Sequence, residues 1–252
     1  MRRMPELSLA SFVALSATFL AAGWVKGVTG MGLPTVAMGV LGAWMSPVVA
    51  ASLLLIPSFV TNLWQMLAGP AAPRLWRRLW PMMAGIVLGT TLGAGLLVRA
   101  DAAWSGAALG TALIAYACCA LAMPRLSITP RAERWLSPVA GALTGGITGA
   151  TGVFVIPAVP FLQSLNLEKD ELVQALGMSF TVSTMAMAAG LLSHGALRMG
   201  QLGVSAYAIL PALAGMWLGQ RVRHRIAPKT FRLCFLLFLL LLGIELVSRP
   251  WR

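Results

Sequence analysis

Gly27-Val-Thr-Gly-Met-Gly32 and Gly146-Ile-Thr-Gly-Ala-Thr-Gly152 are glycine-rich stretches that interrupt apolar segments in the two halves of the chain. Where a membrane helix breaks, backbone N–H and C=O groups lose their partners, and lipid cannot replace them. Such breaks are tolerated where the backbone lines a cavity inside the protein. Interrupted segments at corresponding places of two halves are typical of broken helices around a site near the membrane midplane.

The composition of the 252-residue chain is that of an integral membrane protein. Hydrophobic residues make up 58% and charged residues 10% of it, with a mean hydropathy of +0.82, whereas a soluble domain is about 45–50% apolar and 25% charged. A soluble chain of this size could not bury so much apolar surface, which excludes a cytosolic enzyme, a secreted disulfide scaffold and a disordered tail. The three cysteines form no framework and are expected to be buried free thiols.

Ten apolar segments are expected to be helical, and a helix needs about 20 apolar residues to cross a bilayer core. Six of them are long enough to span, the first is borderline, and the second, sixth and seventh are short. The segments are 8–25, 33–45, 46–69, 79–98, 102–123, 135–148, 152–165, 171–194, 203–222 and 230–247. The predicted fold class is an all-α integral membrane protein with Gly-broken helices near the midplane.

Three sets of residues recur in the same order in the two halves. The first Gly/Thr stretch matches the second, Ser58-Phe59 matches Ser179-Phe180, and Pro81-x3-Gly85-x3-Gly89 matches Pro211-x3-Gly215-x3-Gly219. We therefore predict transmembrane repeats over 1–124 and 135–252, joined by an inter-repeat loop at 125–134. Each repeat holds five segments, an odd number, so the two repeats would have inverted topology.

The net charge of +12 comes from basic residues in short clusters between apolar segments. This pattern favours membrane orientation and contact with lipid headgroups, and argues against nucleic acid as a partner. The more basic set of alternate loops is expected in the cytoplasm and both chain ends outside. That set holds Arg74, Arg77, Arg78, Arg125, Arg131, Arg134, Lys169, Arg221, Arg223, Arg225, Lys229 and Arg232; the other holds Arg2, Arg3, Arg99, Arg198, Arg249 and Arg252.

The N-terminus carries a competing signal. Arg2 and Arg3, an apolar stretch and Ala21-Ala22-Gly23 together resemble a signal peptide. Cleavage there would deprive the first repeat of its first segment, so we expect the stretch to be retained. The same two arginines favour the opposite orientation, since the first helix often dominates topology.

The two glycine-rich stretches are the best candidates for a binding site. Exposed N–H groups and the positive end of the following half-helix suit an anion, and threonine hydroxyls add donors. The alternative is that these glycines only allow helices to pack closely. The candidate residues here are Gly27, Thr29, Gly30, Gly32, Gly146, Thr148, Gly149, Thr151 and Gly152.

Polar residues inside neighbouring apolar segments are further candidates. Lys26 directly precedes the first break, where it would either counter an anionic substrate or snorkel to the membrane surface. Asn62 shares a helical face with Ser58 and Gln65. In the second half, Ser179 and Ser183 occupy the corresponding segment. These side chains would contact substrate or form hydrogen bonds between helices.

Other reactive residues form no recognisable site. His194 would either titrate in a proton-coupled cycle or lie at the membrane interface. The fourteen methionines show no convergent soft-metal pattern and are expected to fill gaps in the helical core. The sequence holds no nucleotide-binding loop, zinc-protease pair or nucleophile elbow, so we predict neither an enzyme nor a cofactor.

The sequence resembles the TauE/SafE sulfite-exporter family of membrane transporters. The resemblance is carried by the runs at 27–32 and 146–152 and by Ala175-Leu-Gly-Met-Ser-Phe180 after a charged loop. It departs from the family pattern at Met31 and Leu33-Pro34, where further glycines are usual. The resemblance implies a multi-pass protein of the bacterial inner membrane that moves sulfite, sulfonates or related organic anions.

The sequence thus predicts a secondary transporter of a small anion that works by alternating access, and the resemblance implies that the anion is sulfite or an organosulfonate. The two breaks would face each other and hold the oxyanion, with Lys26 adding charge and Asn62 and Ser183 orienting the substrate. The sequence is compatible with either H⁺ or Na⁺ as the coupling ion. It is also compatible with assembly into a homo-oligomer. The alternatives are a soft-metal or cation carrier and a non-transporting membrane assembly factor.

Overall fold

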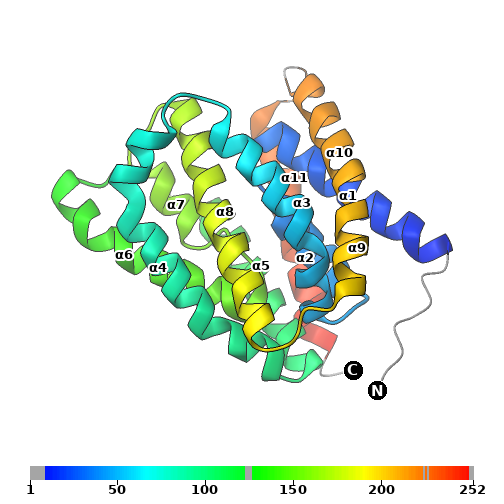
Figure 1. Ribbon diagram of the computed structural model, residues 1–252. Coiled ribbons are helices and arrows are strands. Elements are labelled where there is room, and N and C mark those ends of the chain that lie inside the picture. The colour runs from blue at the N-terminus through cyan, green and yellow to red at the C-terminus, as the bar shows by residue number, and fades with distance from the viewer. Residues whose placement is uncertain (1–8, 123–126, 224, 226, 250–252) are drawn as a thin grey trace.

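The chain folds into a bundle of α-helices. The computed structural model describes residues 9–122, 127–223, 225 and 227–249, and these form eleven helices and no strand. The helices are α1 (Leu9–Thr29), α2 (Leu33–Gly42), α3 (Pro47–Leu67), α4 (Ala72–Arg99), α5 (Ala102–Ala122), α6 (Pro130–Thr151), α7 (Ala158–Gln163), α8 (Lys169–Ser193), α9 (Met199–Tyr207), α10 (Ile209–Val222) and α11 (Pro228–Ser248) (Figure 1). The all-α prediction is confirmed. Arg2, Arg3, Arg252 and the whole of the 124–126 junction, which includes Arg125, lie outside the described residues.

Seven helical segments are long and apolar enough to cross a membrane. They are Leu9–Thr29, Pro47–Leu67, Ala72–Arg99, Ala102–Ala122, Lys169–Ser193, Gly200–Val222 and Thr230–Ser248. The six predicted spanning segments all fall among them, and the borderline first segment joins them. The protein is therefore multi-pass, as its composition requires.

The helix that holds the sixth segment is longer than its apolar stretch, although it is not among the seven candidate membrane spans. α6 has 22 residues, because it begins before the apolar stretch, in a polar first turn. Thr129 caps that turn by accepting a hydrogen bond from Ala132 N, and Glu133 pairs with Arg78 of α4. A hydropathy scan does not detect these first turns of the helix, because it scores their side chains as polar and takes no account of the hydrogen bond and ion pair that stabilise them. α2 and α7, with 10 and 6 residues, are short as predicted.

Glycines join two pairs of helices, α1 with α10 and α4 with α6, through direct backbone contact. A Cβ atom added at any of ten glycines would lie less than 3.0 Å from a backbone atom of the partner helix. In the first pair these are Gly23, Gly27, Gly215 and Gly219; in the second they are Gly85, Gly89, Gly93, Gly141, Gly145 and Gly149. Small residues that let helix backbones touch are a common means of association in membranes.

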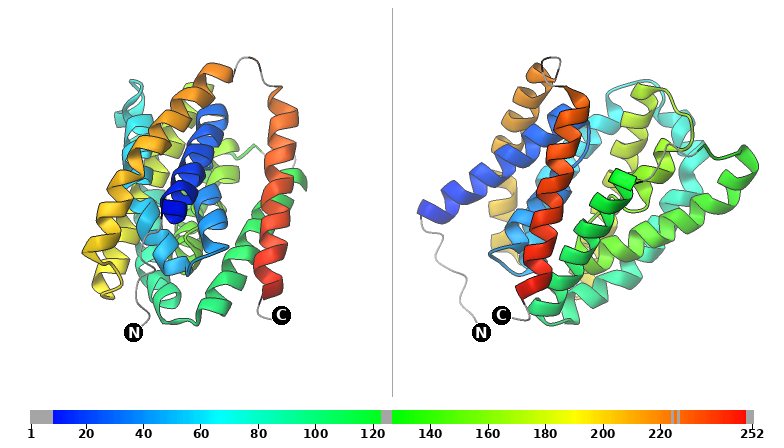
Figure 2. Two further views of the ribbon diagram at one scale, coloured as in Figure 1. Left: turned by 90° about the vertical axis from the view of Figure 1, so that its right-hand side faces the viewer. Right: turned by 180° about the vertical axis from the view of Figure 1, so that it is seen from behind.

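Two further helix pairs complete the bundle. α3 and α8 run antiparallel through its centre, and α8 is the most buried of the candidate spans (Figure 1). α5 packs against α11, which runs along the outside of the bundle (Figure 2). The expectation of buried thiols is wrong for Cys118 and Cys234, which are exposed because these two peripheral helices turn one face away from the protein.

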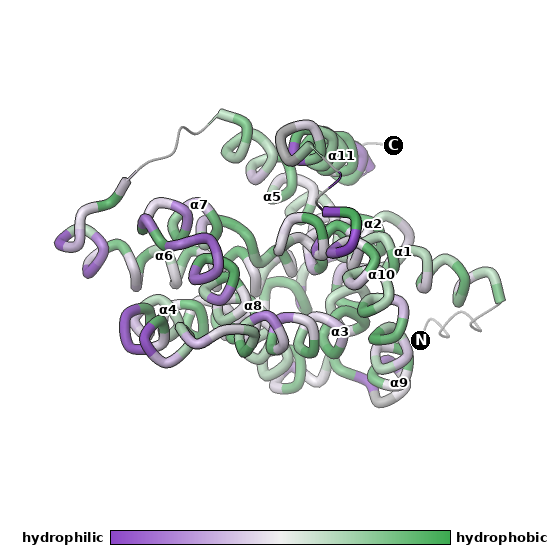
Figure 3. The backbone as a smooth tube through the Cα atoms, turned by 90° about the horizontal axis from the view of Figure 1, so that it is seen from above, coloured by the Kyte–Doolittle hydropathy of each residue, from purple (hydrophilic) through white to green (hydrophobic). Residues whose placement is uncertain are grey.

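The basic residues gather at the ends of the bundle. The N-terminal ends of α4 and α8 and the C-terminal end of α10 lie together at the upper end in Figure 1, where Figure 3 shows hydrophilic segments around the starts of α4 and α6. The C-terminal ends of α4, α8 and α11 lie at the opposite end. The two predicted sets of basic loops are therefore separated in space wherever the structure describes them.

Candidate functional site

Lys26 lies inside the protein near the end of α1, with only 2% of its surface exposed. Its ammonium group donates a hydrogen bond to Thr61 Oγ1 at 3.2 Å and another to Asn62 Oδ1, both on α3. The three ion pairs within the described part of the chain all involve other residues, so no carboxylate there neutralises Lys26. The side chain therefore does not snorkel to the membrane surface.

A buried cation that has only neutral partners is costly. The effective penalty for taking one ion out of water is several kcal/mol, and hydrogen bonds to neutral oxygens offset part of it. An ammonium group has three N–H donors, and Lys26 uses two of them for Thr61 and Asn62. An anion would supply both the missing charge and the acceptor for the third N–H.

Further unpartnered polar atoms lie on the two central helices. Four fully buried groups have no hydrogen-bond partner within the described residues: the hydroxyls of Ser58, Ser179 and Ser183 and the Asn62 side-chain nitrogen. α8 packs closely on α3 here, because a Cβ at Gly177 would lie 3.0 Å from Asn62 O. Buried donors are normally paired, so an unpaired group of this kind points to a ligand or an ordered water.

The first break, between α1 and α2, is held by local hydrogen bonds. Gly30 and Gly32 have φ angles of +81° and +100°, which glycine adopts without steric cost. Thr29 Oγ1 lies 2.7 Å from Met31 O and accepts a hydrogen bond from Met31 N at 3.2 Å. Gln65 Nε2 donates to Gly30 O at 2.7 Å and ties the break to α3.

The second break follows α6 and has the same local construction. Gly152 has a φ of +73°, and Thr151 Oγ1 donates to Ile147 O at 2.7 Å and accepts from Val153 N at 3.2 Å. Thr148 Oγ1 donates to Val153 O at 3.1 Å. The threonine hydroxyls at both breaks are thus engaged by neighbouring backbone and shape the breaks, instead of standing free for a ligand.

The second break lies against α2. Gly152 packs against Met38, since an added Cβ would lie 2.6 Å from the Met38 methyl carbon. That the two breaks face each other stays a prediction.

Three of the predicted site glycines belong to helix contacts. Gly27 packs against the α10 backbone, and Gly149 against the α4 backbone. The backbone of Gly146 lies against Gly89 and Gly93, although a Cβ at Gly146 itself would meet nothing within 4 Å. For these residues the contacts favour close packing, which was the alternative interpretation of the motifs.

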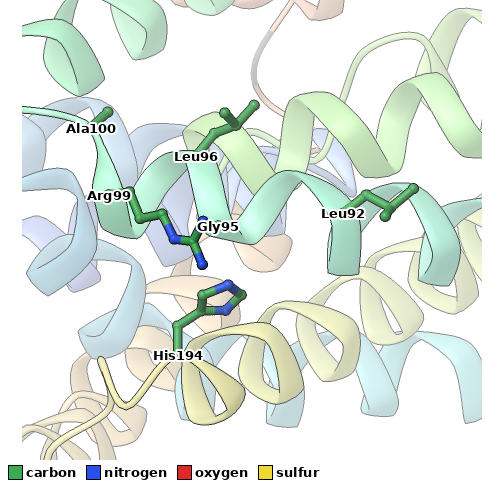
Figure 4. Close-up of a pocket in the computed structure, with 6 residues that line it drawn as sticks. All are labelled: Leu92, Gly95, Leu96, Arg99, Ala100 and His194. Carbon is green, nitrogen blue, oxygen red and sulfur yellow. The ribbon is translucent and has the colours of Figure 1, made fainter.

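His194 lies far from Lys26, at the other end of α8. It caps the helix, with Nδ1 2.8 Å from Gly190 O, and its ring lies over Gly95 beside the Arg99 guanidinium (Figure 4). These residues line a surface hollow of about 460 Å³. His194 is roughly 25 Å along α8 from Gly177, at the helical rise per residue. The structure thus brings Lys26 and Asn62 together but not His194.

Sequence reasoning missed the two side chains that complete the interior contacts. Thr61 accepts from Lys26, and Gln174 of α8 donates to Met66 O at 2.9 Å and Gly69 O at 2.6 Å. Two signals in the sequence were available: Thr61 is a polar residue directly beside Asn62, and Gln174 is a polar residue in an otherwise apolar stretch. The described residues contain no group of three His, Cys, Asp or Glu side chains that could hold a metal ion.

The fold and this interior define a polytopic helical membrane protein with a buried cation and unpartnered hydrogen-bond donors at its centre. The chain belongs to the sulfite exporter TauE/SafE family, whose sequence model matches residues 15–246. The family is one of membrane transporters, and membership indicates export of sulfite or a related sulfur compound. No curated protein and no solved structure gives a significant match to the chain.

Proposed function

We propose that this protein is a secondary transporter of a small oxyanion, sulfite or an organosulfonate, and not an enzyme. The observation that carries the proposal is Lys26, a buried cation whose hydrogen bonds to the described residues all go to neutral groups of α3. The family supports a substrate of this type, because its description is that of sulfite exporters.

Lys26, Asn62, Ser179 and Ser183, which we call the Lys26 cluster, have the chemistry to hold such a head group. Sulfite and sulfonate each present three oxygens that accept hydrogen bonds and carry negative charge. Lys26 would supply the charge, while the free N–H of Asn62 and the hydroxyls of Ser179 and Ser183 would donate to the oxygens. Charge-assisted hydrogen bonds of this kind are about twice as strong as neutral ones.

We further propose that residues 1–124 and 135–252 form two inverted repeats. The pairing of α1 with α10 corresponds to the pairing of α6 with α4. α3 packs against α8, its counterpart in the other repeat, and α5 packs against its counterpart α11. Thr29 and Thr151 each bond the carbonyl four residues before and the N–H two residues after. This correspondence differs by about one helical turn from the motif alignment, which matched Thr29 with Thr148.

In this correspondence Lys26 is equivalent to Thr148, so the charge is supplied by one repeat only. The two glycine-packed pairs, α1 with α10 and α4 with α6, would each move as a unit against the central α3 and α8. Such rocking of one helix group against another is the usual means of alternating access in repeat transporters. The more basic end would face the cytoplasm of a bacterial inner membrane.

The test is flux through purified protein in liposomes. Labelled sulfite, sulfate and an organosulfonate are supplied separately, with and without gradients of H⁺ or Na⁺. We expect saturable flux of sulfite or the sulfonate, and its response to each gradient identifies the coupling ion. Absence of flux for all three anions, in protein shown to be folded, would refute the proposal and favour a membrane assembly factor.

A further inference from the structure

A second polar site lies between the first turns of α4 and α6, away from the Lys26 cluster. It is a hollow of about 370 Å³ that we call the Arg134 pocket. Its lining residues are Arg78, Pro81, Pro130, Glu133, Arg134 and Ser137. The transport mechanism proposed above uses none of them.

The charges in the Arg134 pocket leave one cation unpaired. Arg78 Nε and Nη2 each donate to a Glu133 carboxylate oxygen at 2.7 Å, and Nη2 also lies 3.5 Å from Leu165 O. This bidentate pair neutralises both groups. Arg134 is exposed, with no acidic partner in the described part of the chain, so the pocket carries a net positive charge.

The wall of the pocket also holds a buried donor without an acceptor. Ser137 is 2% exposed, and its hydroxyl has no hydrogen-bond partner among the residues that the structure describes. It lies three residues after Arg134 on α6, so the two side chains share one helical face. A guanidinium group and a free hydroxyl on one wall are suited to an oxyanion.

The surroundings of the pocket are those of a membrane interface. Trp80 of α4 and Trp135 of α6 are 57% and 81% exposed, and tryptophan is enriched where headgroups meet acyl chains. Leu136 and Val139 follow on α6 with exposed side chains. An anion bound beside Arg134 would therefore have an apolar surface next to it, which a phospholipid can cover and a free ion cannot.

We propose that the Arg134 pocket binds the phosphate group of an anionic phospholipid. Arg134 pairs with the phosphate charge, Ser137 donates a hydrogen bond to a phosphate oxygen, and the acyl chains lie along the exposed apolar side chains of α6. Basic pockets between membrane helices are known to hold anionic headgroups. The site would anchor the α4–α6 pair in the membrane, and the inference does not depend on which anion is transported.

Native mass spectrometry of the purified full-length protein tests this inference. The protein is titrated with phosphatidylglycerol and, separately, with phosphatidylcholine. The variants are Arg134→Gln and Ser137→Ala. Arg131→Gln is the matched control, because it removes the same charge from the same turn of α6 at a residue that does not line the pocket.

We expect wild-type protein to retain phosphatidylglycerol in preference to phosphatidylcholine. Arg134→Gln should weaken phosphatidylglycerol binding about fivefold, the effect of one basic side chain near a membrane surface. Ser137→Ala should weaken it about fivefold as well, the effect of one hydrogen bond. Arg131→Gln should stay within about twofold of wild type, since it leaves the pocket unchanged.

Three outcomes would overturn the inference. Equal retention of the two lipids would show that the pocket does not select a charged headgroup, and an equal loss in Arg131→Gln would show diffuse surface charge instead of a site. Displacement of phosphatidylglycerol by inorganic phosphate at millimolar concentration would identify a free-anion site. Should Arg134→Gln fail to fold, Ser137→Ala decides, because it removes a single oxygen from the wall.

Discussion

Replacing Lys26 by glutamine removes a buried positive charge while keeping a side chain that can donate to Thr61 and Asn62. The proposed substrate would then lose the one buried positive charge that the described part of the chain offers it. Because the charge has no carboxylate partner in the described residues, the same change also removes a desolvation penalty from the empty protein. Substrate binding and stability should therefore respond in opposite directions.

The magnitude follows from the proposed contact of Lys26 with the anion. Two unit charges 4 Å apart interact by about 4 kcal/mol at an effective dielectric constant of 20, and a charge-assisted hydrogen bond contributes about 1.5–3 kcal/mol net. A loss of about 2–4 kcal/mol corresponds to a dissociation constant roughly 30- to 700-fold higher. The free energy of unfolding without substrate should stay level or rise.

Thermal unfolding in detergent measures both effects. At a sulfite concentration 100 times the wild-type dissociation constant, ligand binding should stabilise the wild type by about 2.7 kcal/mol and Lys26→Gln by less than about 1 kcal/mol. Liposome flux gives the matching functional result. Lys169→Gln is the control, because it removes the same charged group from an exposed position at the start of α8.

Two results would refute the reasoning. If Lys26→Gln binds and transports sulfite as the wild type does, the buried cation has no part in the site. If the variant instead loses stability without substrate by as much as it loses binding, Lys26 holds α1 to α3 and its role is structural.

The remaining predictions concern packing and the breaks. Gly145→Ala should lower the free energy of unfolding by about 1–3 kcal/mol, because the added methyl group would collide with the α4 backbone. Gly146→Ala is the control and should be neutral or stabilising, because its added methyl group would enter open space. Equal melting temperatures of the two variants would contradict this prediction. Gln65→Leu should destabilise by about 1–3 kcal/mol, because carbonyl oxygens of the first break and of α8 lose their donor, while Gln163→Leu on the exposed face of α7 should not. Thr151→Val should cost about 1–3 kcal/mol, since a buried N–H after the break loses its acceptor, and an unchanged melting curve would count against the hydrogen bond.

Hydropathy and motifs were sufficient to predict the class of protein and the family. The cost of exposing apolar surface adds up residue by residue, so composition alone requires a membrane. Gly30, Gly32 and Gly152 adopt positive φ angles that other residues avoid. Gly30 and Gly152 directly follow the ends of α1 and α6, so the sequence itself carries a signal for where the two helices end.

The motifs alone do not fix the register between the two repeats that we propose. Glycines recur every three or four residues here, so a motif matches its counterpart almost equally well after a shift of one helical turn. The hydrogen bonds of Thr29 and Thr151 support the alignment that we propose, because each hydroxyl bridges the same backbone positions around its break.

The packed helices also decided what each polar side chain does. A lysine at the end of an apolar segment has the same sequence signature whether it snorkels or is buried, and its environment depends on where α3 lies. In this protein α3 brings Asn62 and Thr61 to Lys26, while backbone carbonyls beside the breaks occupy the threonine hydroxyls. Local spacing predicts a helix and its breaks, but the partner of a buried charge comes from a distant segment, and only the packing of the helices brings the two together.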